Sequence, residues 1–91
     1  CEANFELAEV YELQGETEKA ALEFKKVGEL YSTNMIYADK ARLRAGRLFE
    51  DLNKNKEALA IYEKIASSRS NQADFAKEKV AAIKFLLKRN K

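Results

Sequence analysis

The sequence lacks several residue types on which enzymes and metal sites depend. Its 91 residues include no histidine, no tryptophan and no proline, together with one cysteine and three glycines. A zinc site of histidine or cysteine ligands, a serine-histidine-aspartate triad and a glycine-rich phosphate loop are therefore excluded. We expect no enzymatic activity, no metal site and no bound cofactor.

The residues that are present favour a folded, all-α domain. Hydrophobic residues make up 46% of the chain, charged residues make up 35%, and the formal net charge is +2. Disordered chains have fewer apolar residues and a larger net charge. The absence of proline removes the strongest helix breaker, and alanine, leucine, glutamate and lysine supply helix formers almost throughout. No apolar run approaches the roughly 18 to 20 residues of a membrane-spanning helix, so no membrane span is expected.

Clusters of turn-forming residues divide the chain into five amphipathic segments, in each of which apolar residues recur at spacings of three and four. The predicted helices cover residues 2–14, 16–31, 35–52, 56–66 and 72–89. Gly15 is expected to end the first helix in the left-handed conformation, because glycine has no Cβ to oppose it. Asn34, and either Ser70 or Asn71, are expected to be N-caps.

The sequence repeats itself. Residues 11–27 recur as residues 49–65 with an offset of 38, and the apolar stripe of the third helix recurs in the fifth with an offset of 35. Such self-similarity predicts stacked helix-turn-helix units. We expect one domain, cut from a longer protein, with the first repeat over 1–31, the second over 35–66, and a C-terminal capping helix with a polar outer side over 72–89.

The repeated positions resemble the tetratricopeptide repeat, whose pattern runs from an aromatic through Leu-Gly, Tyr, Ala and a second aromatic to a closing Pro. The first unit matches with Asn4, Leu7, Ala8, Tyr11, Ala20, Phe24 and Ser32, and the second with Arg42, Ala45, Gly46, Phe49, Ala58, Tyr62 and Ser70. The leading aromatic, the first glycine and the closing prolines are absent. The resemblance implies a right-handed α-α superhelix, a short solenoid that serves as a non-catalytic scaffold and binds a peptide or helix of another protein.

The offset of 38 exceeds the usual 34 residues of this family by about one helical turn. It resembles the longer repeats of bacterial envelope proteins, such as the periplasmic Tol-Pal-associated protein and the lipoprotein of the outer-membrane assembly machinery. This resemblance favours an envelope assembly, in the periplasm or cell envelope rather than the cytoplasm.

In that family the first helix of each pair lines a concave groove. The register of the motif implies a partner-binding groove of Phe5, Glu9, Glu12, Lys40, Leu43, Arg47 and Glu50. Phe5 and Leu43 are the informative pair, because apolar side chains on a groove favour a partner. The alternative is that the charged residues are merely solvated. Phe5 and Glu9 replace family residues that capture a C-terminal carboxylate, so that activity is not expected.

Charge is distributed unevenly along the chain. Residues 1–31 contain eight acids and three bases, and the remainder contains seven acids and fourteen bases. An alternative function is therefore a membrane-surface or self-assembly module, in which the last helix meets anionic lipid or the acidic end of a second copy. Its basic residues are Lys77, Lys79, Lys84, Lys88, Arg89 and Lys91. Nucleic-acid binding is not expected, because the aromatic residues occupy packing positions.

Cys1 is the chain's one thiol. Two interpretations remain open: the lipidated first residue of a mature lipoprotein, or an unpaired cysteine at the boundary of a segment cut from a longer chain. A single cysteine supports no intramolecular disulfide, so it does not indicate a redox compartment.

Overall fold

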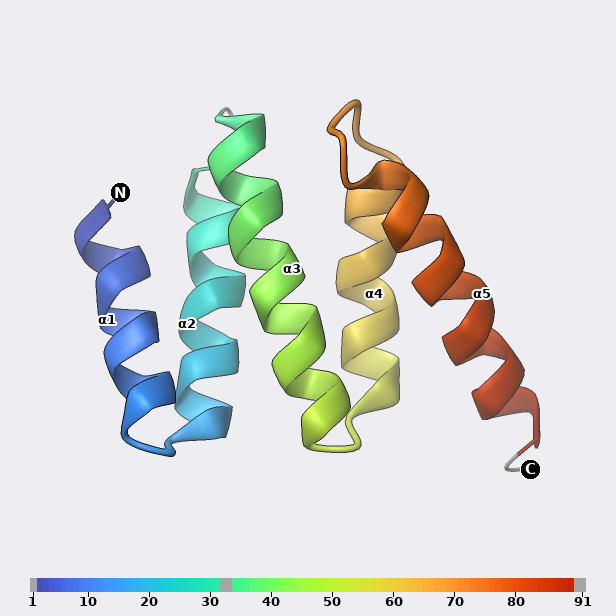
Figure 1. The fold of residues 1–91 in the computed structure, drawn as a ribbon, viewed down its shortest axis with the longest axis horizontal. Helices are drawn as coiled ribbons and strands as arrows, with labels where there is room; N and C mark the ends of the chain where they lie inside the picture. The colour runs from blue at the N-terminus through green and yellow to red at the C-terminus, as the bar shows by residue number, and fades with distance from the viewer. Residues whose placement is uncertain (1, 32–33, 90–91) are drawn as a thin grey trace.

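The computed structural model describes residues 2–31 and 34–89. These residues form five α-helices, with no strand among them (Figure 1). The helices are α1 (Glu2–Leu13), α2 (Thr17–Leu30), α3 (Met35–Asp51), α4 (Asn55–Ala66) and α5 (Ala73–Arg89). Each bound lies within one residue of its predicted position, so the predicted all-α class and the helix pattern are confirmed. Cys1, Ser32 and Lys91 lie outside the described residues.

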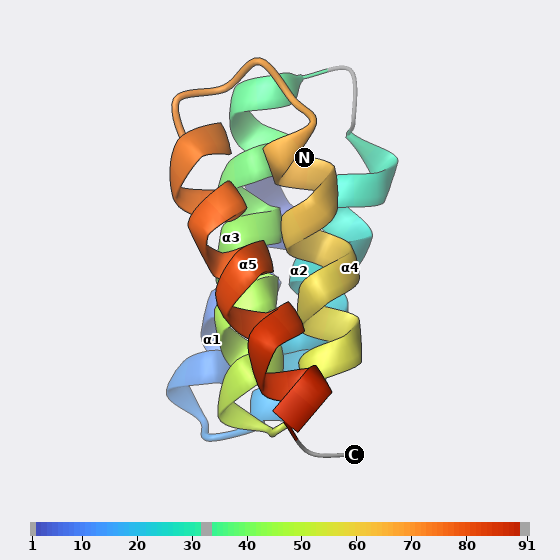
Figure 2. The ribbon, with the colours of Figure 1, turned by 90° about the vertical axis from the view of Figure 1, so that its right-hand side faces the viewer.

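Each helix packs chiefly against its neighbours in the sequence, from α1 on α2 through to α4 on α5. Seen from the side, α1, α3 and α5 form one layer and α2 and α4 form the other (Figure 2). The resulting slab measures 39 × 30 × 16 Å. This arrangement is a short solenoid, in which no helix pair buries its apolar face without the next one.

The core is made of small residues where helices touch and aromatic residues where they leave space. Phe24 and Tyr62, which are 38 residues apart, are both fully buried. Gly46 on α3 lies against the Tyr62 ring so closely that a Cβ there would stand 2.8 Å from Tyr62 Cζ. The packing positions predicted for Phe24, Gly46 and Tyr62 are therefore confirmed.

The two turns inside the repeats have the same geometry. Gly15 has φ 78° and Asn53, which is 38 residues later, has φ 60°. In each turn the next amide donates a hydrogen bond to the carbonyl five residues back, at 2.9 and 2.8 Å. The left-handed conformation predicted for Gly15 is confirmed. The same conformation at Asn53 was not predicted, although asparagine is one of the few side chains that tolerate it.

Polar side chains accept hydrogen bonds from backbone amides at the start of α3 and just before α5. Asn34 Oδ1 accepts a hydrogen bond from the amide of Tyr37 at 3.3 Å, which confirms it as the N-cap of α3. Ser70 Oγ accepts from the amide of Gln72 at 3.3 Å, just before α5 begins. Ser70 therefore stabilises the turn that leads into α5 and lies two residues before the N-cap position, which is Gln72.

The outer side of α5 differs from what a polar cap would offer. Ala76 and Ile83 on its inner side are buried, whereas Phe85 is 61% exposed and Leu86 is 44% exposed. A capping role for residues 72–89 stays a prediction, and the expected polar outer side is corrected to a mixed one.

Candidate functional site

The predicted groove residues on α1 and α3 are joined by a residue that the sequence analysis did not single out, Arg44. Its Nη2 donates to Glu12 Oε1 at 2.5 Å, and its Nη1 lies 3.6 Å from Glu9 Oε2. Glu12, Arg44, Arg47 and Asp51 line a small hollow of about 90 Å³ together with Leu48. The structure thus brings Glu9, Glu12 and Arg47 to one surface, with much of the acidic charge of α1 already paired.

Phe5 is placed differently from the prediction. It is 5% exposed, and its ring contacts Phe24 at 5.1 Å and Tyr37 at 5.3 Å between centroids. Lys40 Nζ lies 5.2 Å from the Phe5 ring centroid and remains exposed, while Leu43 is half-buried against the core. The expectation that Phe5 offers an apolar surface to a partner is wrong, because rings from α2 and α3 enclose it.

Glu50 faces α4 and α5. Its Oε1 accepts a hydrogen bond from Tyr62 Oη at 2.7 Å, and its Oε2 lies 2.9 Å from Lys79 Nζ. Burial, followed by the hydrogen bond to the Glu50 carboxylate, raises the pKa of the Tyr62 phenol well above its usual range. Glu50 therefore links three helices, and two structural contacts already engage its oxygens.

Exposed apolar residues on α5 were missed as groove residues. Lys79 marks the side of α5 that faces α3, and Phe75 and Leu86 lie four residues before and seven after it on that side. They are 45% and 44% exposed. The offset of 35 was the available signal for Phe75, because it maps the predicted groove residue Lys40 onto Phe75. That offset was applied only to the buried stripe.

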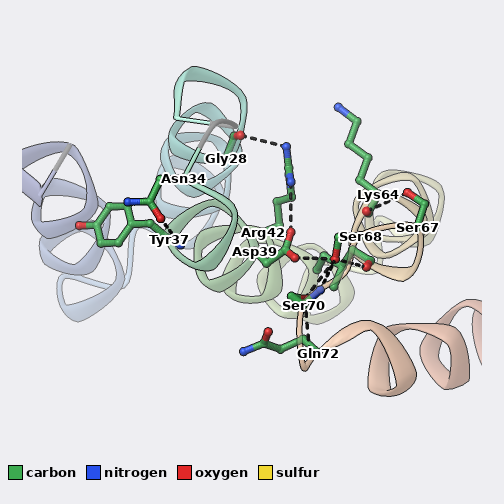
Figure 3. A network of polar contacts seen from close by, with 11 residues as sticks. Gly28, Asn34, Tyr37, Asp39, Arg42, Lys64, Ser67, Ser68, Ser70 and Gln72 are labelled. Carbon is green, nitrogen blue, oxygen red and sulfur yellow. Dashed lines mark hydrogen bonds and ion pairs between the residues drawn. The ribbon is translucent and has the colours of Figure 1, made fainter.

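A buried carboxylate lies at the centre of a network of polar contacts next to the loop between α4 and α5 (Figure 3). Asp39 is fully buried, and Arg42 Nη1 donates to its Oδ1 at 3.1 Å. Arg42 Nη2 donates to the carbonyl of Gly28 at 3.0 Å. Ser68 Oγ lies 2.6 Å from Asp39 Oδ2 and 3.1 Å from Ser70 Oγ. This network ties α2, α3 and the α4–α5 loop together, and its role is structural.

A second polar contact joins the repeats at their turns. Lys54, at the start of α4, pairs with Glu18 in the first turn of α2. The hydrogen bond and charge of Lys54 hold the pKa of the Glu18 carboxyl below its usual range, and the same contact raises the pKa of Lys54. Both groups are exposed, so the pair fixes geometry more than it stabilises.

The described residues contain neither a candidate metal site nor a candidate membrane-spanning helix. Over 2–31 and 34–89, no three carboxylate or cysteine side chains gather in a way that could hold a metal ion. Over the same residues, no helix combines the length and the apolarity that crossing a membrane requires.

Comparison with known proteins identifies the repeats. The family model described as tetratricopeptide repeat matches residues 2–34 and 40–71. The first match covers α1 and α2, and the second covers most of α3 and all of α4. Neither the curated proteins nor the solved structures contain a match to the chain.

Proposed function

Because the chain belongs to the tetratricopeptide repeat family, we propose that it is a non-catalytic scaffold that binds a peptide or helix of another protein across α1, α3 and α5. Repeats of this family generally mediate protein–protein interactions. The observation that carries the more specific proposal is the exposure of Phe75 and Leu86 on the side of α5 that faces α3.

The partner we propose has apolar side chains that contact α5 and carboxylates that face the bases of α3. Phe75 and Leu86 supply exposed apolar area, which usually contributes most of the binding energy of an interface. Lys40 and Arg47 are exposed on α3 and supply positive charge, which orients a partner and speeds encounter. Glu9, Glu12 and Glu50 are paired with bases of this chain and contribute less.

A selection of displayed peptides against the purified chain would test this. Peptides that bind are titrated by calorimetry against the wild type and against Leu86→Ala and Arg47→Glu. We expect Leu86→Ala to weaken binding by roughly 1 to 3 kcal/mol, because it removes an apolar contact. We expect Arg47→Glu to alter mainly the association rate and its salt dependence.

Lys64→Glu is the matched control, because Lys64 is exposed on α4, in the other layer. It should bind as tightly as the wild type. Equal binding by Leu86→Ala, Arg47→Glu and the wild type would contradict the proposed surface. Loss of binding in Lys64→Glu alone would move the site to α2 and α4.

The setting we propose is an assembly of the bacterial envelope, and the 38-residue offset between the repeats supports it. The left-handed turn residues Gly15 and Asn53 follow the same offset, so the longer repeat length belongs to the fold as well as to the sequence. Cell fractionation of the native host, with an antibody against this chain, tests the setting. Recovery in the cytoplasmic fraction would contradict it.

A further inference from the structure

The two outermost helices each have a face that no helix of the described chain covers. Leu7 and Val10 on α1 are 41% and 44% exposed. Their counterparts in α3, 38 residues later, are Ala45 and Leu48, which are buried in the core. The outer face of α1 therefore has the apolar residues of an inter-helix contact, and none of the helices described for residues 2–31 and 34–89 lies against it.

The outer face of α5 is also apolar. Phe85 is its most exposed large hydrophobic residue at 61%. Lys84, Phe85 and Lys88 line an open hollow of about 480 Å³ together with Leu87. A branched aliphatic side chain from another molecule could enter such a hollow and bury apolar area on both sides.

The two faces carry opposite charge. The sequence of α1 contains four glutamates and no base, whereas that of α5 contains five bases and two acids. Lys79 and Lys84 are paired with Glu50 and Glu63 of this chain, which leaves Lys77, Lys88 and Arg89 as the bases that α5 offers. Glu9 and Glu12 are held by Arg44, so Glu6 is the exposed acid beside Leu7. Two α5 faces would repel each other, as would two α1 faces. An α1 face and an α5 face attract each other, and charge complementarity of this kind selects the orientation of an encounter.

We propose that copies of this chain associate head to tail, with the outer face of α5 in one copy seated on the outer face of α1 in the next. Leu7 and Val10 then cover Phe85, and Glu6 faces the lysines of α5. This contact joins two different surfaces, so it forms open rows of molecules rather than closed dimers.

The association should be weak and reversible. The twelve residues of α1 are about 18 Å long, and one helix face of that length buries less than the roughly 800 Å² per partner of a standard interface. The contact goes beyond the proposed function, because it leaves the surface formed by Phe75 and Leu86 open to a partner along the row.

Sedimentation velocity over about 10 μM to 1 mM would test the proposal. We expect the average mass of the wild type to rise with concentration from the 10.4 kDa of one chain, without levelling off at two copies. High salt should oppose this rise. Leu22→Gln is the matched control, because Leu22 is 53% exposed on α2, outside both faces, and this variant should associate like the wild type.

Two variants, each with the apolar residues of one face replaced, make the test specific. One carries Leu7→Gln and Val10→Gln, and the other carries Phe85→Gln. These residues are exposed, and circular dichroism checks that both variants fold. Each alone should associate about tenfold or more weakly than the wild type. Mixed in equal amounts, they should form a species of two copies and nothing longer, because each contributes one intact face.

Three results would overturn the proposal. The first is a wild type that stays at the mass of one chain throughout. The second is dimerisation of the α1 variant alone, which would mean that two α5 faces pair. The third is a chain that stays monomeric in solution but co-sediments with vesicles of anionic phospholipid and loses this binding in Phe85→Gln, which would assign the α5 face to a lipid surface.

Discussion

Lys79 on α5 meets Glu50 on α3 in the same way that Arg44 on α3 meets Glu12 on α1. The nitrogen-to-oxygen distances are 2.9 and 2.5 Å. Both cations also lie over an aromatic ring of the intervening helix. Arg44 is 4.8 Å from the Phe24 centroid and Lys79 is 5.7 Å from that of Tyr62. One base thus fastens α3 to α1, and one fastens α5 to α3.

This repeated contact should be measurable as a coupling energy. In a double-mutant cycle of Arg44→Met and Glu12→Gln, we expect a coupling energy of about 0.5 to 1 kcal/mol in the free energy of unfolding. This coupling energy should decrease as the salt concentration rises. The half-exposed Lys19 and Glu16 pair, at 3.3 Å, is the control and should give about 0.3 kcal/mol. Coupling no larger than that of the control would mean that the contact does not join the repeats energetically.

The buried Asp39 should be among the most sensitive positions. Replacement by alanine should cost about 3 kcal/mol of unfolding free energy, because it leaves the partly buried Arg42 without its charge partner and without the acceptor of its Nη1 group. Chemical denaturation measures this cost. Asp51→Ala on the exposed side of α3 should change the free energy by less than about 0.5 kcal/mol. A small effect at Asp39 would mean that Ser68 and Arg42 find other partners.

Gly46→Ala should destabilise the domain even though alanine is the better helix former. The new Cβ would press on the Tyr62 ring, which is buried and held by its hydrogen bond to Glu50. We expect a loss of about 1 to 3 kcal/mol by thermal or chemical melts. In a Tyr62→Leu background the same change should be neutral or stabilising. Equal effects in both backgrounds would show that the ring is not the obstacle.

Tyr62 should make stability fall in alkaline solution. The fold raises the pKa of its phenol above the ordinary value of about 10, so the unfolded chain releases this proton first. The contribution is fully present below pH 10 and is lost as the pH rises further, at about 1.4 kcal/mol per pH unit. Denaturation at several alkaline pH values should show a steeper decline for the wild type than for Tyr62→Phe. Parallel declines would exclude Tyr62 as the cause.

The helices could be predicted from the sequence because their determinants are local. Every predicted helix end lies within one residue of the observed end. The prediction used apolar residues at spacings of three and four, clusters of turn-forming residues, and Gly15. Asp39 could not be found in this way, because its burial depends on Ser68, which is 29 residues away. Phe5 was misplaced for a similar reason: its register points to the groove, but Phe24 and Tyr37 from two other helices enclose it.

The candidate site was only partly predictable. Glu9, Glu12 and Arg47 reach one surface as expected, because they follow the register of α1 and α3. The exposure of Phe75 and Leu86 was not predicted, although the offset of 35 maps Lys40 onto Phe75, since α5 was considered only as a cap. Pairing of Glu50 with both Tyr62 and Lys79 is a three-helix arrangement that no linear pattern contains.

Packing chiefly between consecutive helices also has a consequence for how the molecule responds to force. The chain ends lie on α1 and α5, at opposite ends of the row in Figure 1. A force that pulls on both ends acts along the row of helices. Because each helix packs mainly against its neighbour, the contacts between helices can open one after another. Small changes in tilt at every contact would let the slab lengthen before any helix unwinds. We expect a domain built in this way to be elastic, and a partner bound across several helices to make it stiffer.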